Sequence, residues 1–301
     1  MVNKETQKNT FYKCIKYKIH NKLKKPLLFY HVPKCAGTTL TVMLSHLFKN
    51  QVRAMGPLFA NNDKGGETAY EFFQKNLELI NKSKINFLYG HLPFEISEFF
   101  NNNFYKITTI RNPIDRTISH YKWMLIRGFC NKNDKLKNLF NENKIPKNVI
   151  VNQFSGIGLK EQNTELSFNL AFKNINDNID YVCKSDDLFY LLKYIISYYN
   201  LPNLVFQNYQ VINADFSLSK EDIEIIEENN QLDMQLYSLL LEKNIFKIEK
   251  IKSSKTEIEQ DYFYSSPLIK INNKNNLIIN YIKLIDIQKK LESKKYIFKE
   301  F

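Results

Sequence analysis

Short hydrophobic runs recur along the first two thirds of the chain, separated by polar loops and amphipathic stretches. The run at 26–32 reads PLLFYHV, and comparable runs stand at 85–89, 105–110 and 179–183. Runs of this length between polar segments are typical of buried strands. The sequence therefore predicts strands at these four places.

Apolar residues with helical spacing follow these runs. After the first run the hydrophobic positions stand at i, i+3, i+4, i+7 and i+8: Leu40, Met43, Leu44, Leu47 and Phe48. After the third run, Asn112 suits a helix N-cap and Pro113 a first helical position. Further helices are expected at 67–82, 94–102, 188–199, 219–229, 232–243 and 274–294. Strands that alternate with helices predict an α/β fold, with a parallel sheet covered on both faces.

The charge of the chain is strongly positive and is carried almost entirely by lysine. The 301 residues contain 43 Lys and Arg against 31 Asp and Glu, a net charge of +12. An anionic partner is therefore expected, whether nucleotide, acidic glycan, nucleic acid or membrane surface. Only four of the basic residues are arginine: Arg53, Arg111, Arg116 and Arg127. Because Lys serves almost everywhere else, Arg at positions 111 and 116 indicates that the planar guanidinium matters there.

The cysteines and the N-terminus bear on the compartment. Four cysteines stand far apart and form no CxxC pair: Cys14, Cys35, Cys130 and Cys183. This spacing predicts neither a zinc cluster nor a disulfide framework. No hydrophobic run approaches the roughly 20 residues of a membrane span, and residues 1–25 lack the apolar core of a signal peptide. The expectation is a soluble cytoplasmic protein, with peripheral attachment to a membrane as an alternative.

The loop after the first predicted strand carries the strongest chemical signal. A loop between a parallel strand and a helix N-terminus binds phosphate readily, because its N–H groups point outward and the helix dipole favours an anion. This loop supplies a cation, two small residues and two hydroxyl groups: Lys34, Ala36 and Gly37, Thr38 and Thr39. In a Walker A motif the Lys would instead follow a Gly. The alternative is a Thr-capped helix beside a solvated Lys34, and this segment alone does not separate the two.

The second signal lies where the third predicted strand ends, in the segment ITTIRNPIDRTISHY at 107–121. Arg111 ends the strand and Ser119 lies in the second turn of the following helix. Both are placed to bind one phosphate, the Arg as a planar fork and the Ser as a hydroxyl donor. The alternative is an ion pair between Asp115 and either arginine. We favour phosphate binding for Arg111 and the ion pair for Arg116.

The third signal is His91, in YGHLP at the end of the second predicted strand. The carboxyl end of a parallel strand is the ligand side of such a sheet, and the ordinary pKa of histidine suits a general base. A single His is more often structural, so this signal is weak by itself. Packing is favoured for His31, and no role is expected for His20, His46 and His120. Cys35 has no evident base partner and is interpreted as a small residue.

Together these segments resemble the sulfotransferases that use 3′-phosphoadenosine 5′-phosphosulfate (PAPS), most closely the heparan sulfate and uronyl 2-O-sulfotransferases and their bacterial relatives. HVPKCAGTTL resembles the 5′-phosphosulfate loop of that family, ITTIRNPIDRTISHY its 3′-phosphate motif, and YGHLPF the strand end with its catalytic His. Weaker likenesses at 151–156, 179–192 and 229–237 extend the resemblance over about 26–243. Cys35 stands where Thr is more usual, and Tyr89 where the animal enzymes have a second His.

The resemblance implies a three-layer, P-loop-like α/β domain. We expect this domain at 26–245, between a basic arm at 1–25 and a Lys-rich extension at 246–301. The weakly patterned stretch 128–178 is expected to be a mobile insertion on the acceptor side, and 51–66 a loop that helps to shape the acceptor pocket.

The resemblance also implies the chemistry. PAPS would be the sulfuryl donor, released as adenosine 3′,5′-bisphosphate, and the acceptor would be a hydroxyl group, most simply of a glycan or glycolipid. Lys34 would stabilise the leaving group and His91 would take the acceptor proton. The donor-binding residues would be Lys34, Cys35, Ala36, Gly37, Thr38, Thr39, Arg111 and Ser119. Neither a metal nor nucleic acid is implied.

Three alternatives stay open. A P-loop-like kinase is disfavoured because the loop lacks the Walker order and no clear metal-binding Asp follows a strand. A non-catalytic basic protein that binds glycans or nucleic acid is permitted by the Lys-rich termini, but no nucleic-acid motif is present. The third is a sulfotransferase fold that has lost activity. The sequence predicts neither the acceptor nor the oligomeric state.

Overall fold

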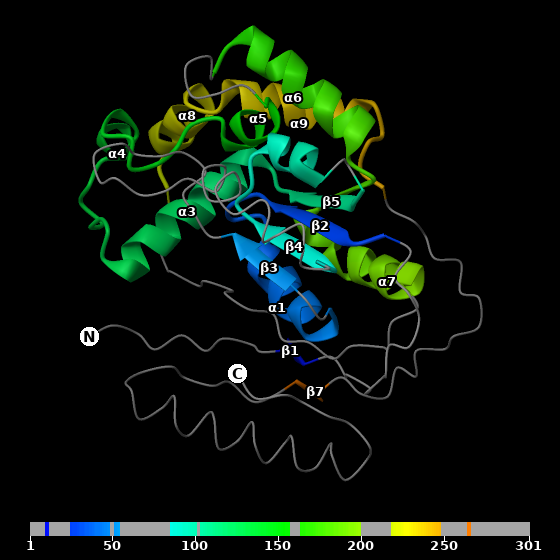
Figure 1. Cartoon of the computed structure of the whole chain (residues 1–301). Coiled ribbons are helices and arrows are strands. Elements are labelled where there is room, and N and C mark those ends of the chain that lie inside the picture. The colour runs from blue at the N-terminus through cyan, green and yellow to red at the C-terminus, as the bar shows by residue number, and fades with distance from the viewer. Residues whose placement is uncertain are drawn as a thin grey trace.

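A five-stranded parallel sheet forms the centre of the fold (Figure 1). The computed structural model describes residues 10–11, 25–48, 51–54, 85–100, 103–156, 163–199, 218–247 and 264–265. The strand order is β3-β4-β2-β5-β6. The strands are β2 (Leu27–His31), β3 (Gln51–Ala54), β4 (Phe87–Gly90), β5 (Tyr105–Ile110) and β6 (Tyr181–Lys184). The expected α/β class is confirmed.

The central strand β2 is buried along its whole length, and its side chains alternate between two cores. Leu28 and Tyr30 belong to one hydrophobic cluster, whereas Leu27 and Phe29 belong to the other. A strand with apolar residues on both faces requires a helical layer on each side. The three-layer arrangement follows directly from the run PLLFYHV.

Helices cover both faces of the sheet (Figure 1). One face carries α1 (Gly37–Leu47) and α7 (Leu188–Tyr199), and the other carries α5 (Val149–Phe154), α6 (Glu165–Asn178) and α9 (Gln231–Glu242). A third cluster joins α3 (Pro113–Arg127), α4 (Leu136–Asn141) and α8 (Lys220–Glu228). The shorter elements are the 3₁₀ helices η2 (Phe94–Phe100) and η4 (Ser185–Asp187), and an antiparallel pair of β1 (Thr10–Phe11) and β7 (Tyr264–Ser265).

The four expected strands are confirmed, and one strand was not expected. Residues 51–54 form β3, at the edge of the sheet beside β4, although the sequence interpretation assigned 51–66 to a loop. The run QVRA is too short and too polar to stand out as a strand. The expected helices at 67–82 and 274–294 lie outside the described residues, as do most of the basic arm and of the Lys-rich extension.

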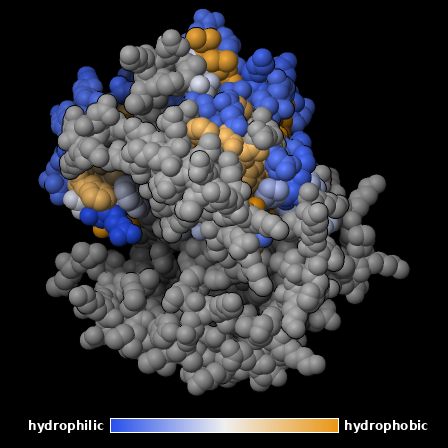
Figure 2. Space-filling model, in the orientation of Figure 1, coloured by the Kyte–Doolittle hydropathy of each residue, from blue (hydrophilic) through white to orange (hydrophobic). Residues whose placement is uncertain are grey.

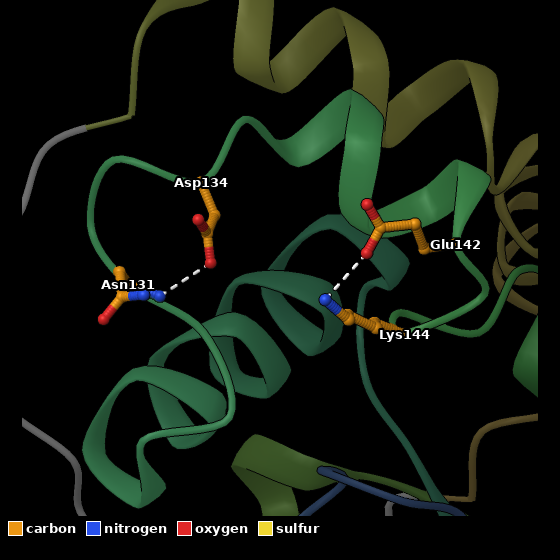
Figure 3. A network of polar contacts seen from close by, with 4 residues as sticks. All are labelled: Asn131, Asp134, Glu142 and Lys144. Atoms are coloured by element: carbon orange, nitrogen blue, oxygen red, sulfur yellow. Dashed lines mark hydrogen bonds and ion pairs between the residues drawn. The ribbon is translucent and has the colours of Figure 1, made fainter.

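The expectation of a mobile insertion at 128–178 is wrong for the residues that the structure describes. This stretch contains α4, α5 and α6, and every residue of α5 is buried. Even its turns are held by polar contacts (Figure 3). The Asn131 N–H donates to Asp134 Oδ2 at 2.8 Å, and Lys144 Nζ lies 2.7 Å from Glu142 Oε2. The segment is therefore part of the folded domain.

The short helix α5 is held from a distance by Asp233 of α9. The two carboxylate oxygens of Asp233 accept from the backbone N–H groups of Ile150, at 3.0 Å, and Val151, at 2.8 Å. No side chain of the local sequence caps this helix start. Because the cap comes from more than 80 residues away along the chain, the sequence pattern of α5 gives no sign of it.

Arg116 is completely buried, and the expected ion pair with Asp115 is wrong. Its Nη2 donates to Thr117 Oγ1 at 2.9 Å and, more weakly, to Asn230 Oδ1 at 3.4 Å. Asp115 is instead exposed at the helix start. Burial raises the pKa of Asp233 to about 6, while the nearby charge of Arg116 acts in the opposite direction. Arg116 is therefore structural, as expected, but its contacts lie in the core and do not include an ion pair with Asp115.

Candidate functional site

Three neighbouring strands bring the three sequence signals to one edge of the sheet. The loop with Lys34 follows β2, His91 follows β4 and Arg111 follows β5, and β4 and β5 flank β2 directly. All these strands are parallel, so their carboxyl ends lie on the same side. The juxtaposition that the sequence interpretation required is therefore present.

The loop after β2 has a backbone that few residues adopt. Lys34 and Ala36 have φ angles of 68° and 60°, in the left-handed region. Each such residue that is not glycine costs roughly 1–2 kcal/mol. The conformation is held by the Cys35 N–H, which donates to the Val32 carbonyl at 3.2 Å, and by Thr109 Oγ1, which donates to the Cys35 carbonyl at 2.6 Å. The loop is thus shaped by its neighbour β5 as well as by its own sequence.

The first turn of α1 lies open toward this loop. Its N-cap is Ala36, which offers no side-chain acceptor to the first N–H groups. Gly37 is the first helical residue, and a Cβ at this position would stand 1.9 Å from Cδ2 of His31. Only glycine therefore fits at position 37. The first backbone N–H groups of α1 have no side-chain cap, and such groups at a helix start can bind an anion. Thr39 is buried, whereas Thr38 is partly exposed at this turn.

Cys35 is buried, and its thiol is expected to be unreactive. Its side chain is 0% exposed, and burial raises its pKa to about 12. A neutral, enclosed thiol is neither a nucleophile nor a ligand contact. This agrees with the interpretation of Cys35 as a small residue, and it leaves only the backbone of Cys35 available to a bound anion.

Lys34 lies in a strongly positive environment. Burial and the charges of Arg111 and Arg127 lower its pKa to about 8. Its Nζ stands 5.5 Å from the centre of the Trp123 ring, a cation–π contact. The loop after β2 and the end of β5 are also joined directly, by the hydrogen bond from Thr109 to the Cys35 carbonyl. A bound anion would relieve the mutual repulsion of these cations.

His91 touches His31, which in turn lies against the loop after β2. The two imidazole centres are 4.8 Å apart and tilted by 59°. His31 also stacks on Phe29 at 5.6 Å and occupies the space beside Gly37. The packing role expected for His31 is therefore present, but its packing partners include His91 and the first turn of α1. His91 itself is only half-buried.

Arg111 and Ser119 flank the start of α3. The expected N-cap at Asn112 is confirmed, since its Oδ1 accepts from the N–H groups of Ile114, at 2.9 Å, and Asp115, at 3.4 Å. Both Arg111 and Ser119 are partly exposed. Among the described residues, neither side chain forms a hydrogen bond or an ion pair. Both remain available to a ligand there.

Comparison with known proteins identifies the family. The sequence profile of the family described as "Sulfotransferase family" matches residues 19–239. The chain belongs to this sulfotransferase family. Among solved structures it is similar to a sulfotransferase from Alicyclobacillus acidocaldarius, at 12% identity and a TM-score of 0.41, over 73% of this chain and 97% of that one. No curated protein matched the sequence.

His120 of this sulfotransferase, for which the sequence interpretation expected no role, contacts the same Trp123 ring as Lys34. Burial and the charges of Arg116 and Lys34 lower the pKa of His120 to about 3, so its ring is neutral. Its centre is 5.6 Å from that of Trp123. A helical spacing links these residues, since His120, Trp123 and Arg127 stand at i, i+3 and i+7 of α3. That spacing is visible in the sequence.

Two further findings concern metal ligands and membrane-spanning helices in this sulfotransferase. Within the described ranges, no three His, Cys, Asp or Glu side chains gather as metal ligands would. The described helices also include none that is long and apolar enough to cross a bilayer.

Proposed function

We propose that this sulfotransferase moves a sulfuryl group from PAPS to a hydroxyl group of a carbohydrate. One observation carries the proposal: the Lys34 loop, His91 and Arg111 lie at the ends of three adjacent parallel strands, where the charge of Arg111 acts on Lys34. A donor with anionic groups at two places suits two such cationic loops.

The residues present fit such a donor. The first N–H groups of α1 are without a side-chain cap, and the absence of a Cβ at Gly37 lets the start of the helix pack against His31. In the proposal, these groups and Lys34 hold the 5′-phosphosulfate, with Thr38 and Thr39 supplying hydroxyls. Arg111 and Ser119 hold the 3′-phosphate, the group that distinguishes this donor from ATP.

The proposed reaction needs a base and a cation. His91 takes the proton of the acceptor hydroxyl while the hydroxyl oxygen forms its bond to sulfur. The bond between sulfur and the phosphate oxygen breaks at the same time, and Lys34 neutralises the charge that gathers on that oxygen. Nothing is oxidised or reduced. Such a base is typically worth about 10²–10⁴-fold in rate.

A labelled-donor assay tests the proposal. Purified protein is incubated with ³⁵S-labelled PAPS and a panel of glycans, glycolipids and small alcohols. We expect transfer by the wild type, loss of transfer in Lys34→Ala and His91→Ala, and retention in Lys220→Ala. Lys220 is a fair control because its side chain is 93% exposed on α8. Full activity in both the Lys34 and His91 variants would refute the mechanism.

A thermal-shift experiment separates the proposal from the kinase alternative. Adenosine 3′,5′-bisphosphate should raise the melting temperature of the wild type, and Arg111→Ala should reduce that shift. Stabilisation by ATP with Mg²⁺ in its place would favour a kinase.

A further inference from the structure

The outer part of α3 presents aromatic and cationic side chains on the side nearest Lys34. Trp123 lies under the Lys34 ammonium group, with 5.5 Å between Nζ and the ring centre. The charge of Arg127, one turn further on, reaches Lys34 and lowers its pKa. These two residues therefore adjoin the group that we propose to act on the leaving oxygen.

Beyond Trp123 the helix ends in an exposed aromatic surface. Phe129 packs against Trp123 with 5.2 Å between ring centres, yet it is 58% exposed, and Ile126 is 60% exposed. The Trp123, Ile126 and Phe129 side chains will be called the α3 platform. Figure 2 shows a hydrophobic patch over the outer end of α3, bordered by hydrophilic side chains. An apolar patch of this kind in a chain with a net charge of +12 requires an explanation.

The platform is held rigidly by the end of the helix. Gly128 adopts a φ of 71°, and the Phe129 N–H donates to the Met124 carbonyl at 2.9 Å. This left-handed C-terminal turn folds the chain back, so that Phe129 returns to the side of Trp123. A fixed pair of aromatic rings loses little conformational entropy when a ligand stacks on it.

We infer that the α3 platform is the acceptor subsite, on which a sugar ring stacks with its C–H face against Trp123 and Phe129. This inference rests on the proposed function. An open aromatic surface suits a ring whose other face and hydroxyl groups remain in water, whereas a phenol or steroid would need an enclosed pocket. Arg127 at the rim adds a preference for a ring that carries a carboxylate or sulfate.

The outer residues of the platform are separated along α3 from Arg111, the proposed contact to the 3′-phosphate. A rise of about 1.5 Å per residue places Trp123 about 15 Å along the helix from its start at Pro113, where Arg111 adjoins it. Ser119, the other proposed 3′-phosphate contact, lies between them, one helical turn before Trp123, whereas Ile126 and Phe129 lie at the far end of the helix. Mutations at the two ends should separate donor binding from acceptor binding.

The chain offers a direct readout, because Trp123 is its only tryptophan. Its emission is recorded with adenosine 3′,5′-bisphosphate bound, during titration with oligogalacturonate, with sulfated dextran oligosaccharides and with unsubstituted dextran of equal length. We expect a saturable change with the two acidic probes and at least tenfold weaker binding of dextran. Phe129→Ala should weaken the binding of the acidic probes at least tenfold, and Arg127→Gln should remove the preference for them.

Tyr190→Ala is the matched control, since this aromatic residue on α7 is 42% exposed and distant along the chain. It should leave the titration unchanged. Calorimetry should give the same affinity for adenosine 3′,5′-bisphosphate in the wild type and in Phe129→Ala. Emission that is insensitive to both acidic probes, or an effect of Phe129→Ala on nucleotide affinity alone, would overturn the inference. Failure of the proposed function can be distinguished from failure of this inference, because the wild type itself would then bind no nucleotide.

Discussion

The hydroxyl group of Thr109 donates a 2.6 Å hydrogen bond to the carbonyl oxygen of Cys35, and so fastens the loop after β2 to the end of β5. Two segments more than 70 residues apart along the chain are joined at the point where the candidate site is formed. The loop after β2 contains two residues in the left-handed region, Lys34 and Ala36, and such residues need restraint from their surroundings.

Thr109→Val should therefore weaken donor binding. The substitution keeps the shape of the side chain but removes the bond, and we expect about 1 kcal/mol lower stability and several-fold weaker binding of adenosine 3′,5′-bisphosphate. Thr108→Val is the control, because Thr108 is equally buried and donates to the Tyr30 carbonyl at 2.9 Å, within the sheet. The Thr108→Val protein should lose a similar amount of stability but keep its affinity for adenosine 3′,5′-bisphosphate. Equal affinity loss in both variants, measured by calorimetry, would contradict the role given to Thr109.

Gly37→Ala should damage both the fold and the donor site. The new methyl group would stand 1.9 Å from the buried ring of His31, and such overpacking typically costs about 1–3 kcal/mol. A double-mutant cycle with His31→Ala, followed by urea unfolding, checks the cause. In the His31→Ala background the added methyl group has room and should cost little. If its cost is the same in both backgrounds, the ring is not the obstacle.

Lys34 sets an alkaline limit on activity. Its pKa in the free protein is lowered to about 8, so the amino group carries a positive charge below that pH and loses this charge above it. We expect kcat/KM, which reports on the free protein, to fall as the pH rises through about 8. Lys34→Arg keeps its charge at higher pH, so whatever activity it retains should not fall there. A fall at the same pH in the arginine variant would assign the limit to another group.

Arg111 and Arg116 should differ in what they support. Arg111→Ala removes a partly exposed side chain at the end of β5, and should weaken binding of adenosine 3′,5′-bisphosphate by about 1.5–3 kcal/mol with little change in stability. Arg116→Ala leaves a cavity in the core and removes the positive charge that acts on Asp233, and should lower stability by about 2–5 kcal/mol. Chemical denaturation and calorimetry on both variants decide the matter. An Arg111 variant that unfolds more readily than the Arg116 variant would reverse these assignments.

Asp233 should give the stability a specific dependence on pH. Burial raises its pKa in the folded protein from 3.8 to about 6, so protonation favours the folded state. The stabilisation is complete below about pH 4 and is lost as the pH rises through about 6. Relative to Asp233→Asn, the wild type should therefore lose stability between these values and change little above them. If the wild type instead gains stability relative to Asp233→Asn as the pH rises over this range, the carboxylate, and not the acid, is favoured in the core.

The sequence predicted what depends on local patterns. The buried strands at Leu27–His31 and Tyr105–Ile110, the Asn112 cap and the meeting of three loops at one sheet edge could all be predicted, because each follows from hydrophobic runs, capping chemistry or parallel topology. The buried helix Val149–Phe154 could not, because its cap is Asp233 from α9. Arg116 was assigned to the wrong partner for the same reason, since its environment is made by distant segments.

Within the candidate site, the sequence named residue types but not their surroundings. Lys34 was identified from its place before a helix, yet its contact with Trp123 depends on how α3 crosses the loop. Cys35 was interpreted as a small residue because it has no base partner in the sequence, and the structure adds that its side chain is completely buried. His120 was passed over, although its helical spacing with Trp123 and Arg127 was available for inspection.

His31 fills the space between the first turn of α1 and the ring of His91, with no room for even a methyl group on Gly37. The His31 ring is therefore in contact with both the helix start and His91. If His91 is the base that we propose, an anion that binds at the helix start is expected to affect its imidazole through His31, so that removal of the acceptor proton would depend on whether the donor is already bound.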